Sequence, residues 1–294
     1  MNQLEDMRIF VTTVEKGSFT GASDALGLSK QFVSRRVAAL EDRLGVRLLN
    51  RTTRRLHVTD AGREYHARAV RILEDVEDAE LAVSSQGDSP RGTLRLTAPM
   101  SFGTLYLGSV LPAFLLRYPA VSVELDLNDR TVDLIHEGYD MGIRIGTLDD
   151  STLIARALAP AQIVTCCSPA YLAGRGAPVT PDDLATHDCL LYGHNRQVNW
   201  TFQEAGKPCS VSVSGCLLAN NGEIVRDAAL AGLGIAWLPT FIVGDALREG
   251  RLVTVLDAYA PPPMVVYAVY PQHRQASLTI RAFVDYLREA LSAP

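Results

Sequence analysis

The stretch from Ser18 to Arg55 constrains this chain most, because it combines two helical patterns, a short break and a run of arginines. In its second half, apolar residues recur in steps of four and three, at Val33, Val37, Leu40 and Leu44. That spacing places side chains on one face of a helix. We expect this face to pack against a core.

The opposite face of the same helix is predicted to be small and polar, since successive residues turn by about 100°. Its residues are Gln31, Ser34, Arg35 and Ala38, with Lys30 and Arg36 beside them. A helix built in this way fits the major groove of DNA. The alternative interpretation is a basic helix face that only meets solvent.

Shorter segments flank this helix. Before it, Phe19, Ala22, Ala25 and Leu26 suit a short helix, and Gly27-Leu28-Ser29 supplies a break followed by a serine N-cap. After it, Leu48, Leu56 and Val58 have the pattern of strands around an arginine-bearing tip. The sequence therefore predicts helix, turn, helix and a basic hairpin, or wing.

Charge is distributed unevenly along the chain. Residues 1–60 hold ten Lys/Arg and seven Asp/Glu, a balance of +3 in a chain of net charge −5. The remainder therefore carries −8. A basic segment joined to an acidic remainder separates a phosphate-binding module from a part that repels DNA.

These residues resemble the winged helix-turn-helix of LysR-type transcriptional regulators. The resemblance is carried by Phe10-Val11, Gly17-Ser18-Phe19, Ala22, Ala25-Leu26, Leu28-Ser29, Val33-Ser34-Arg35, Leu40-Glu41, Leu44-Gly45, Leu48-Leu49, Arg51-Thr52 and Thr59-Asp60-Ala61-Gly62. It continues through the rest of the chain in segments 94–99, 117–146, 168–172, 219–239 and 250–256. It implies a sequence-specific DNA-binding regulator controlled by a small molecule.

The resemblance implies which residues contact DNA. The expected recognition-helix contacts are Ser29, Lys30, Gln31, Ser34, Arg35 and Arg36, and the expected wing contacts are Arg51, Thr53, Arg54 and Arg55. Gln31 and Arg35 are best placed for base edges, and Ser34 for a phosphate.

A heptad-like stripe follows the wing, at Ala61, Tyr65, Ala69, Ile72, Val76, Ala79 and Val83. In the resembling proteins this helix pairs two chains, so we expect a homodimer or a dimer of dimers. The alternative is an ordinary amphipathic helix packed on its own domain. The polar segment Gln86 to Gly92 contains Pro and Gly and ends the helix.

Beyond this linker, strand-like and helical segments alternate, which indicates an α/β domain with a largely parallel sheet. Strands are expected at 94–98, 121–127, 141–145, 163–167, 211–218 and 264–270, and helices to about 117, near 132–137, at 223–231 and at 277–291. The resemblance implies two lobes, as in periplasmic binding proteins, joined by two crossings around a cleft.

We therefore divide the chain into three parts. A winged helix-turn-helix domain occupies 1–59, a dimerisation helix with its hinge 60–90, and an effector-binding domain 91–294. Within the last, lobe one spans about 91–162 and 265–294, and lobe two about 163–264.

The expected effector-binding residues lie at strand ends and at the starts of following helices, where ligands bind in open α/β sheets. They are Met100, Ser101, Phe102, Arg144, Gly146, Trp200, Asn220, Asn221 and Pro239. Three simpler roles remain open. Ser101 could only cap a helix, Arg144 could pair with Asp129 or Asp140, and Asn220 and Asn221 could be caps.

The predicted function is transcription regulation in a bacterial cytoplasm, with promoter DNA, a small aromatic or carboxylated effector and, for an activator, RNA polymerase as partners. Catalytic residues, a metal and a cofactor are not expected, because the chain lacks GxSxG, HExxH and P-loop motifs. No stretch approaches the roughly 18 apolar residues of a membrane span. A solute-binding protein would explain the lobes but not the basic wing.

Thiol-based redox sensing is the second alternative. The five cysteines are Cys166, Cys167, Cys189, Cys209 and Cys216, an odd number without CxxC spacing. Cys166 and Cys167 fall in a strand that has the pattern of a buried one, so ordinary apolar packing is the simpler expectation.

Overall fold

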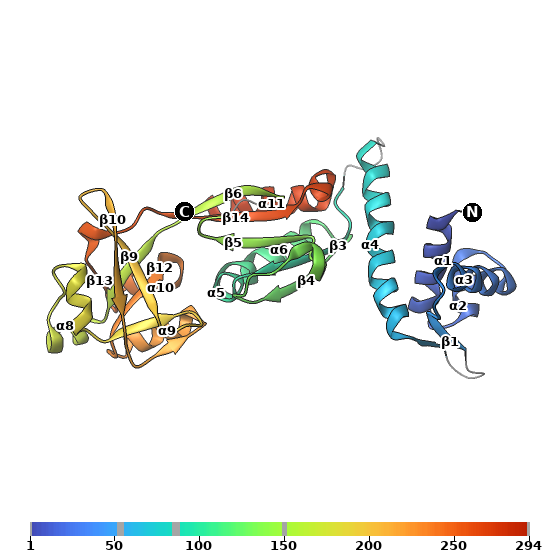
Figure 1. The fold of residues 1–294 in the computed structure, drawn as a ribbon. Coiled ribbons are helices and arrows are strands. Elements are labelled where there is room, and N and C mark those ends of the chain that lie inside the picture. The colour runs from blue at the N-terminus through green and yellow to red at the C-terminus, as the bar shows by residue number, and fades with distance from the viewer. Residues whose placement is uncertain (1, 52–55, 84–88, 149–151, 293–294) are drawn as a thin grey trace. The chain divides into compact units, whose positions relative to one another are not determined.

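The computed structural model describes residues 2–51, 56–83, 89–148 and 152–292. They form two compact units, Met1–Asp88 and Ser89–Pro294 (Figure 1). The predicted wing residues Thr53, Arg54 and Arg55 lie outside the described residues, as does the side chain of Arg51.

The first unit is a helix-turn-helix followed by a hairpin and a long helix. Its elements are α1 (Gln3–Glu15), α2 (Phe19–Leu26), α3 (Lys30–Leu44), β1 (Leu49–Arg51), β2 (Leu56–Val58) and α4 (Asp60–Val83). Ser29 caps α3 by accepting a hydrogen bond from the Phe32 amide. Gly27 ends α2 and Gly45 ends α3 with φ of +66° and +68°, which glycine adopts without strain. The predicted helix, turn and helix are confirmed.

The core of this unit lies among the helices. Val33, Val37 and Leu40 of α3 are fully buried against Phe10 of α1, as their spacing predicts. Leu44, expected on the same face, is 41% exposed, so that expectation is wrong. It is the last residue of α3, beside the Gly45 cap, where the packed face has ended.

A buried carboxylate connects α3 to the hairpin. Glu41 Oε1 accepts hydrogen bonds from the amides of Leu48 and Leu49, at 2.8 and 2.9 Å. Both leucines are buried in the core of the unit. Because a carboxylate bonds these two amides directly, the position of β1 is fixed relative to the helix that precedes it.

Helix α4 is divided in its packing. Ala69 is buried in the core of the first unit, and Ala61, Tyr65, Val70 and Leu73 pack against that core. The predicted stripe therefore serves its own domain over its first half. Ile72, in contrast, is 40% exposed, and Ala79 is also exposed. At about 1.5 Å per residue, its 24 residues span about 36 Å.

The second unit contains two five-stranded sheets and a hairpin. The first sheet has the order β4-β3-β5-β14-β6 and defines lobe one. Its strands are β3 (Gly92–Ala98), β4 (Val121–Leu127), β5 (Met141–Ile145), β6 (Leu153–Ala161) and β14 (Met264–Pro271). Its helical segments are α5 (Met100–Phe102), a π-turn (Gly103–Leu107), α6 (Gly108–Arg117), α7 (Leu134–Glu137), a 3-10 turn (Gln272–Ala276) and α11 (Leu278–Ser292).

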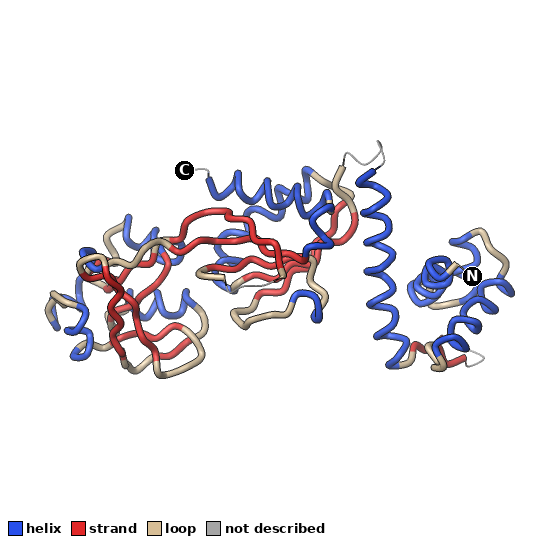
Figure 2. The backbone as a smooth tube through the Cα atoms, turned by 45° about the horizontal axis from the view of Figure 1, so that its top comes forward, coloured by secondary structure: helices blue, strands red, loops and turns tan. Residues whose placement is uncertain are grey.

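The second sheet has the order β11-β8-β12-β7-β13 and defines lobe two, with the hairpin β9/β10 beside it (Figure 2). Its strands are β7 (Ile163–Cys167), β8 (Cys189–Tyr192), β9 (Val198–Glu204), β10 (Lys207–Val213), β11 (Leu218–Ala219), β12 (Ile235–Pro239) and β13 (Val253–Val255). Its helical segments are α8 (Pro169–Arg175), a 3-10 turn (Pro181–Thr186), α9 (Gly222–Leu230), α10 (Thr240–Arg248) and a 3-10 turn (Asp257–Tyr259).

The expectation of a largely parallel sheet is wrong. In lobe one, β3 pairs in parallel with β4 and β5, but β14 pairs antiparallel with β5 and β6. Lobe two repeats this division, with antiparallel β7 beside β12 and β13. The strands that enter each lobe by a crossing supply the antiparallel pairs. The single strand expected at 211–218 is two strands, β10 and β11, in different sheets.

Two crossings connect the lobes, as predicted. The chain passes from β6 to β7 through Gln162 and returns from β13 to β14. Gln162 holds the two crossings together, because its Nε2 donates to the Pro261 carbonyl at 3.4 Å. Its own carbonyl accepts from the Thr240 amide at 2.8 Å.

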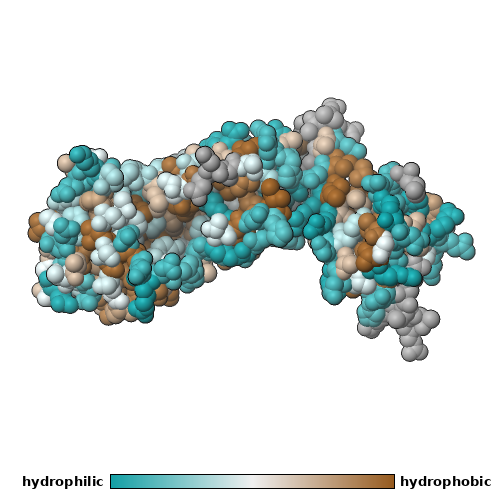
Figure 3. All heavy atoms as spheres, viewed as in Figure 1, coloured by the Kyte–Doolittle hydropathy of each residue, from teal (hydrophilic) through white to brown (hydrophobic). Residues whose placement is uncertain are grey.

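The helical segment Met100–Arg117 has the length and hydropathy of a membrane span, so the expectation that no stretch approaches one is wrong. One face of the segment packs in the core of lobe one, where Phe102, Leu107 and Phe114 are buried, whereas Leu116 is exposed. Phe114 contacts Phe283 of α11 with ring centroids 5.0 Å apart. On the face drawn in Figure 3, hydrophobic residues of the second unit are interspersed with hydrophilic ones. The segment is therefore a core element of lobe one.

Replacing Glu41 with Ala should destabilise the first unit by about 2–4 kcal/mol, because two buried amides lose their acceptor. Hydrogen–deuterium exchange of the full chain measures this locally, as faster exchange at Leu48 and Leu49. Glu15→Ala, at the exposed end of α1, is the control. Unchanged exchange in Glu41→Ala would contradict the assigned role of the carboxylate.

Candidate functional site

The exposed face of α3 carries the polar side chains predicted to contact DNA. Lys30, Gln31 and Arg35 are exposed, and Ser34 is half-buried. The Arg35 guanidinium carbon lies 5.7 Å from the centroid of the Phe32 ring one turn earlier. This cation–π contact holds the Arg35 side chain along the surface of α3. The face therefore presents donors and acceptors suited to base edges and phosphates.

Arg36 does not share that face, although it was expected among the DNA contacts. It forms an ion pair with the buried Asp6 of α1, and its own side chain is only 18% exposed. Arg43 lies 4.0 Å from the same carboxylate. Asp6 thus draws two arginines of α3 toward α1. Arg36 has a structural partner that the helix periodicity alone could not reveal.

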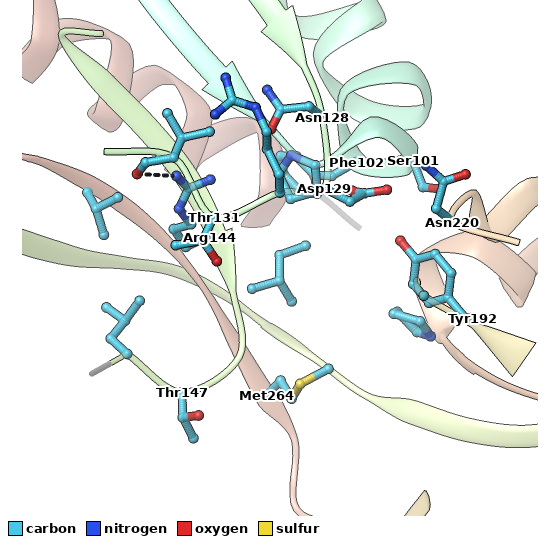
Figure 4. Close-up of a pocket in the computed structure, with 18 of the residues that line it drawn as sticks. Ser101, Phe102, Asn128, Asp129, Thr131, Arg144, Thr147, Tyr192, Asn220 and Met264 are labelled. Atoms are coloured by element: carbon cyan, nitrogen blue, oxygen red, sulfur yellow. Dashed lines mark hydrogen bonds between the residues drawn. The ribbon is translucent and has the colours of Figure 1, made fainter. Parts of the chain in front are cut away.

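A pocket of about 530 Å³ opens between the lobes of the second unit. Lobe one contributes residues after β4, at the end of β5 and along β14, and lobe two contributes the ends of β8, β11 and β12 (Figure 4). Five predicted residues line it, namely Ser101, Phe102, Arg144, Asn220 and Pro239. The volume suits a small organic molecule.

Four predicted effector residues are not among those that line the pocket. Trp200 is 2% exposed in the core of lobe two and stacks on Trp237, with centroids 6.2 Å apart. Asn221 caps α9 by accepting from the Ile224 amide at 3.0 Å. Gly146 ends β5 with φ of +122°, and its amide donates to the Val265 carbonyl. The Met100 amide donates a hydrogen bond to Asp129, which also belongs to lobe one.

Ser101 connects the two lobes. Its hydroxyl donates to Glu223 Oε2 and accepts from the Gly222 amide at 3.1 Å, both at the start of α9. It does not cap its own helix α5, so that alternative is wrong. Nearby, the Asp129 carboxylate accepts from the Met100 amide at 3.0 Å.

The side chains at this end of the pocket are acidic and partly desolvated. Burial raises the pKa of Asp129 and, with the charges of Asp129 and Glu223, raises the pKa of Tyr192 to about 12. Figure 4 shows Asp129 on the same side of the pocket as Ser101, Tyr192 and Asn220. At neutral pH, Tyr192 is therefore a neutral hydrogen-bonding group.

Arg144 lies on the other side of the pocket (Figure 4). Its Nη2 donates to the Val132 carbonyl at 3.2 Å. Desolvation, followed by the charge of nearby Arg130, lowers the pKa of the Arg144 guanidinium. In the described ranges neither Asp129 nor Asp140 pairs with it, because Asp140 pairs with Arg274 at 3.1 Å. Both internal pairings considered for Arg144 are thus wrong.

Sequence reasoning missed much of the polar lining, namely Asn128, Asp129, Arg130, Thr131, Thr147, Tyr192 and His194. A signal was available for two groups. Residues 128–131 directly follow β4, and Tyr192 ends β8, so both stand at the carboxyl ends of strands. That is where open sheets place ligand contacts. Among the described residues, no cluster of His, Cys, Asp and Glu is arranged to hold a metal ion.

Three of the five cysteines are buried, and the other two are at least partly exposed. Cys166 and Cys167 belong to different cores of lobe two, because neighbours on β7 point to opposite faces. Burial raises the pKa of Cys166 and Cys189 to about 12 and of Cys167 to about 11. These three thiols are therefore protonated and unreactive at neutral pH. Cys216 is exposed and Cys209 is half-buried.

Known proteins match the whole chain. Residues 4–63 match the bacterial regulatory helix-turn-helix protein family of lysR type, and residues 87–292 match the LysR substrate-binding domain. The regulator PtxR of Pseudomonas aeruginosa is 39% identical, over 98% of this chain and 93% of its own.

Solved structures show the same likeness. The LysR-type regulator CrgA of Neisseria meningitidis is 35% identical, with a TM-score of 0.64 over 100% of both chains. The virulence activator AphB of Vibrio cholerae is 29% identical, with a TM-score of 0.61 over 97% of this chain and 98% of its own. This chain belongs to the LysR family of DNA-binding transcriptional regulators, with an N-terminal helix-turn-helix and a C-terminal effector-binding domain.

Proposed function

We propose that this regulator binds promoter DNA as a homodimer or dimer of dimers and that a small molecule in the interlobe pocket controls its action. One observation carries the proposal: the chain that exposes Gln31 and Arg35 on α3 also contains a pocket of about 530 Å³ lined from two lobes. A pocket of that size suits a metabolite rather than a macromolecule.

DNA contact is assigned to two surfaces. On α3, Gln31 and Arg35 read base edges, while Ser29, Lys30 and Ser34 meet phosphates. In the wing, Arg51, Thr53, Arg54 and Arg55 complete the contact at phosphates or in the minor groove. The exposure of Lys30, Gln31 and Arg35 supports this assignment.

Pairing of two chains is assigned to the second half of α4. Ile72 and Ala79 of the predicted stripe are exposed there, whereas earlier stripe residues pack within the first unit. A second copy of the same helix covers such a face in an isologous dimer. Two DNA-binding heads then read two half-sites.

The protein has two arrangements that differ in the spacing of the DNA-binding heads. The small molecule binds these two arrangements with different affinity and so shifts the balance between them. We propose an effector with an acidic group for Arg144 and an apolar part against Phe102 and Phe241. The protein acts in the cytoplasm without catalysis or a cofactor, and RNA polymerase is a further partner if it activates transcription. The effect on DNA is a change in head spacing and bend.

DNase footprinting immediately upstream of this protein's own gene tests the proposal. We expect a discrete protected region that shortens or shifts with one member of a panel of small aromatic and carboxylic acids. The shift follows because the effector redistributes the two arrangements. Absence of protection at moderate salt and micromolar protein would contradict DNA binding at this site.

Arg35→Ala should weaken binding to the footprinted duplex by about 1–3 kcal/mol and weaken binding to random duplex much less, because Arg35 is proposed to read a base. Fluorescence anisotropy with both duplexes measures the difference. Arg36→Ala is the matched comparison. It should lower thermal stability because the buried Asp6 loses the nearer of its two arginine partners. Equal losses on both duplexes for Arg35→Ala would reject base reading.

Thiol sensing is not favoured, and alkylation tests that conclusion. With iodoacetamide at pH 7.5, peptide mapping of the native chain should show modification at Cys216 first, while Cys166, Cys167 and Cys189 react only after unfolding. Their pKa values, about 12, 11 and 12, leave almost no thiolate at that pH. Rapid native modification of any of these three would restore the redox alternative.

A further inference from the structure

The interlobe pocket has two polar sides of opposite charge. Asp129 lines one side, with Ser101, Tyr192, His194 and Asn220 around it, and Arg144 stands at the other. Glu223 is not among the lining residues, but it accepts the hydrogen bond of the Ser101 hydroxyl. The apolar part of the lining includes Phe102, Phe241 and Met264. This distribution restricts what kind of molecule the pocket can take.

The acidic side already satisfies the donors that an anion would need. The Met100 amide donates to Asp129 Oδ1 at 3.0 Å, and the Gly222 amide donates to Ser101 Oγ at 3.1 Å. The Ser101 hydroxyl proton is directed to Glu223. Oxygen atoms of the chain itself thus occupy both helix starts. A carboxylate of a ligand would meet the Asp129 carboxylate here, with Glu223 close to it, and would be repelled.

Two acceptor atoms in this region have no donor among the residues that the structure describes. Asp129 Oδ2 and Asn128 Oδ1 are buried acceptor atoms without a hydrogen-bond partner in the described part of the chain. Buried acceptors are normally satisfied, so each carries a cost until a donor arrives. Within the described ranges no Lys or Arg forms an ion pair with Asp129 or Glu223. Burial raises the pKa of Asp129, while the Met100 amide and the charge of nearby His194 offset only part of that rise.

Arg144, on the other side of the pocket, has hydrogen-bond donors that an acidic group of a ligand could use. Its guanidinium is partly desolvated, with the Val132 carbonyl as its hydrogen-bond acceptor among the described residues. A carbonyl leaves most of the five guanidinium N–H groups available. An acidic group can bind such a fork through two parallel hydrogen bonds.

We propose that the effector is amphoteric: its acidic group binds Arg144, and its protonated amine binds Asp129, with Asn128 Oδ1 as a further acceptor. The inference rests on the proposed role of this pocket as the effector site. An apolar middle part contacts Phe102, Phe241 and Met264. The chemical class is an amino acid or a small aminoalkyl carboxylic acid.

Amine binding also connects the ligand to lobe position. Asp129 belongs to lobe one, whereas Glu223 and Tyr192 belong to lobe two, and Ser101 bridges the lobes by its bonds to Gly222 and Glu223. An ammonium group at Asp129 is also attracted to Glu223. It therefore competes with Ser101 for that carboxylate and changes how strongly the lobes are held together.

Calorimetric titration of the full-length protein with matched probes tests the inference. The first set is 4-(aminomethyl)benzoate, 4-methylbenzoate and benzylamine. The second set is the ω-amino acids from 3-aminopropanoate to 6-aminohexanoate, each compared with the straight-chain acid of the same length. At least one amphoteric probe should bind about ten- to hundredfold tighter than its matched acid and amine, as expected for a charge-assisted hydrogen bond.

Variants assign the two groups of the probe. Asp129→Asn keeps an acceptor for the Met100 amide but removes the charge, so it should abolish the preference for the amine-bearing probe and leave the matched acid unaffected. Arg144→Gln should weaken the acid and the amphoteric probe alike. Glu289→Gln, on the exposed side of α11, removes a carboxylate far from the pocket lining and is the control.

Footprinting with the same preparations separates two failures. If DNA is protected but matched acids bind as tightly as amphoteric probes, or no amphoteric probe binds, the ligand class is wrong and DNA regulation stands. If amphoteric probes are preferred in the Asp129-dependent manner but DNA is not protected, the ligand class is supported and the proposed function fails.

Discussion

The pocket depends on the double crossing between the lobes. Because the chain leaves lobe one after β6 and returns at β14, each sheet is completed by a strand that continues from the other lobe. Gln162 joins the two crossings through Pro261, so the lobes share one short, hydrogen-bonded hinge. Across this hinge, Ser101 of one lobe reaches α9 of the other.

Local patterns in the sequence predicted part of the helices and strands, including the helix-turn-helix, β3, β4, β5 and α11. They did not predict α1, α8, α10, β6, β8, β9, β12 or β13. Ser29 caps the start of α3 as expected, because a cap acts over one helical turn. Gly45 ends α3 with a positive φ, which was not predicted from the sequence. Sheet topology was predicted less well. The antiparallel pairing of β14 joins residues more than a hundred positions from β5 and β6. No short-range pattern in the sequence encodes such a pairing.

The candidate sites show the same division between local and distant causes. Arg35 and Arg36 are neighbours of equal charge, and only the buried Asp6 of another helix distinguishes them. Trp200 was expected among the effector contacts, but Trp237 stacks on it inside lobe two. Asp129 was considered only as a partner for Arg144, although it directly follows β4. Its proximity to Glu223 arises because the lobes meet there.

The ion pairs of Asp6 also reduce how many basic side chains of the first unit are available to DNA phosphates. DNA releases condensed counterions when basic side chains neutralise its phosphates, and each such contact steepens the fall of affinity with salt by about one logarithmic unit per tenfold change. Arg36 and Arg43 are directed to Asp6 inside the domain. The ionic-strength dependence of binding should therefore be shallower, by about two such units, than the ten basic residues at positions 1–60 suggest.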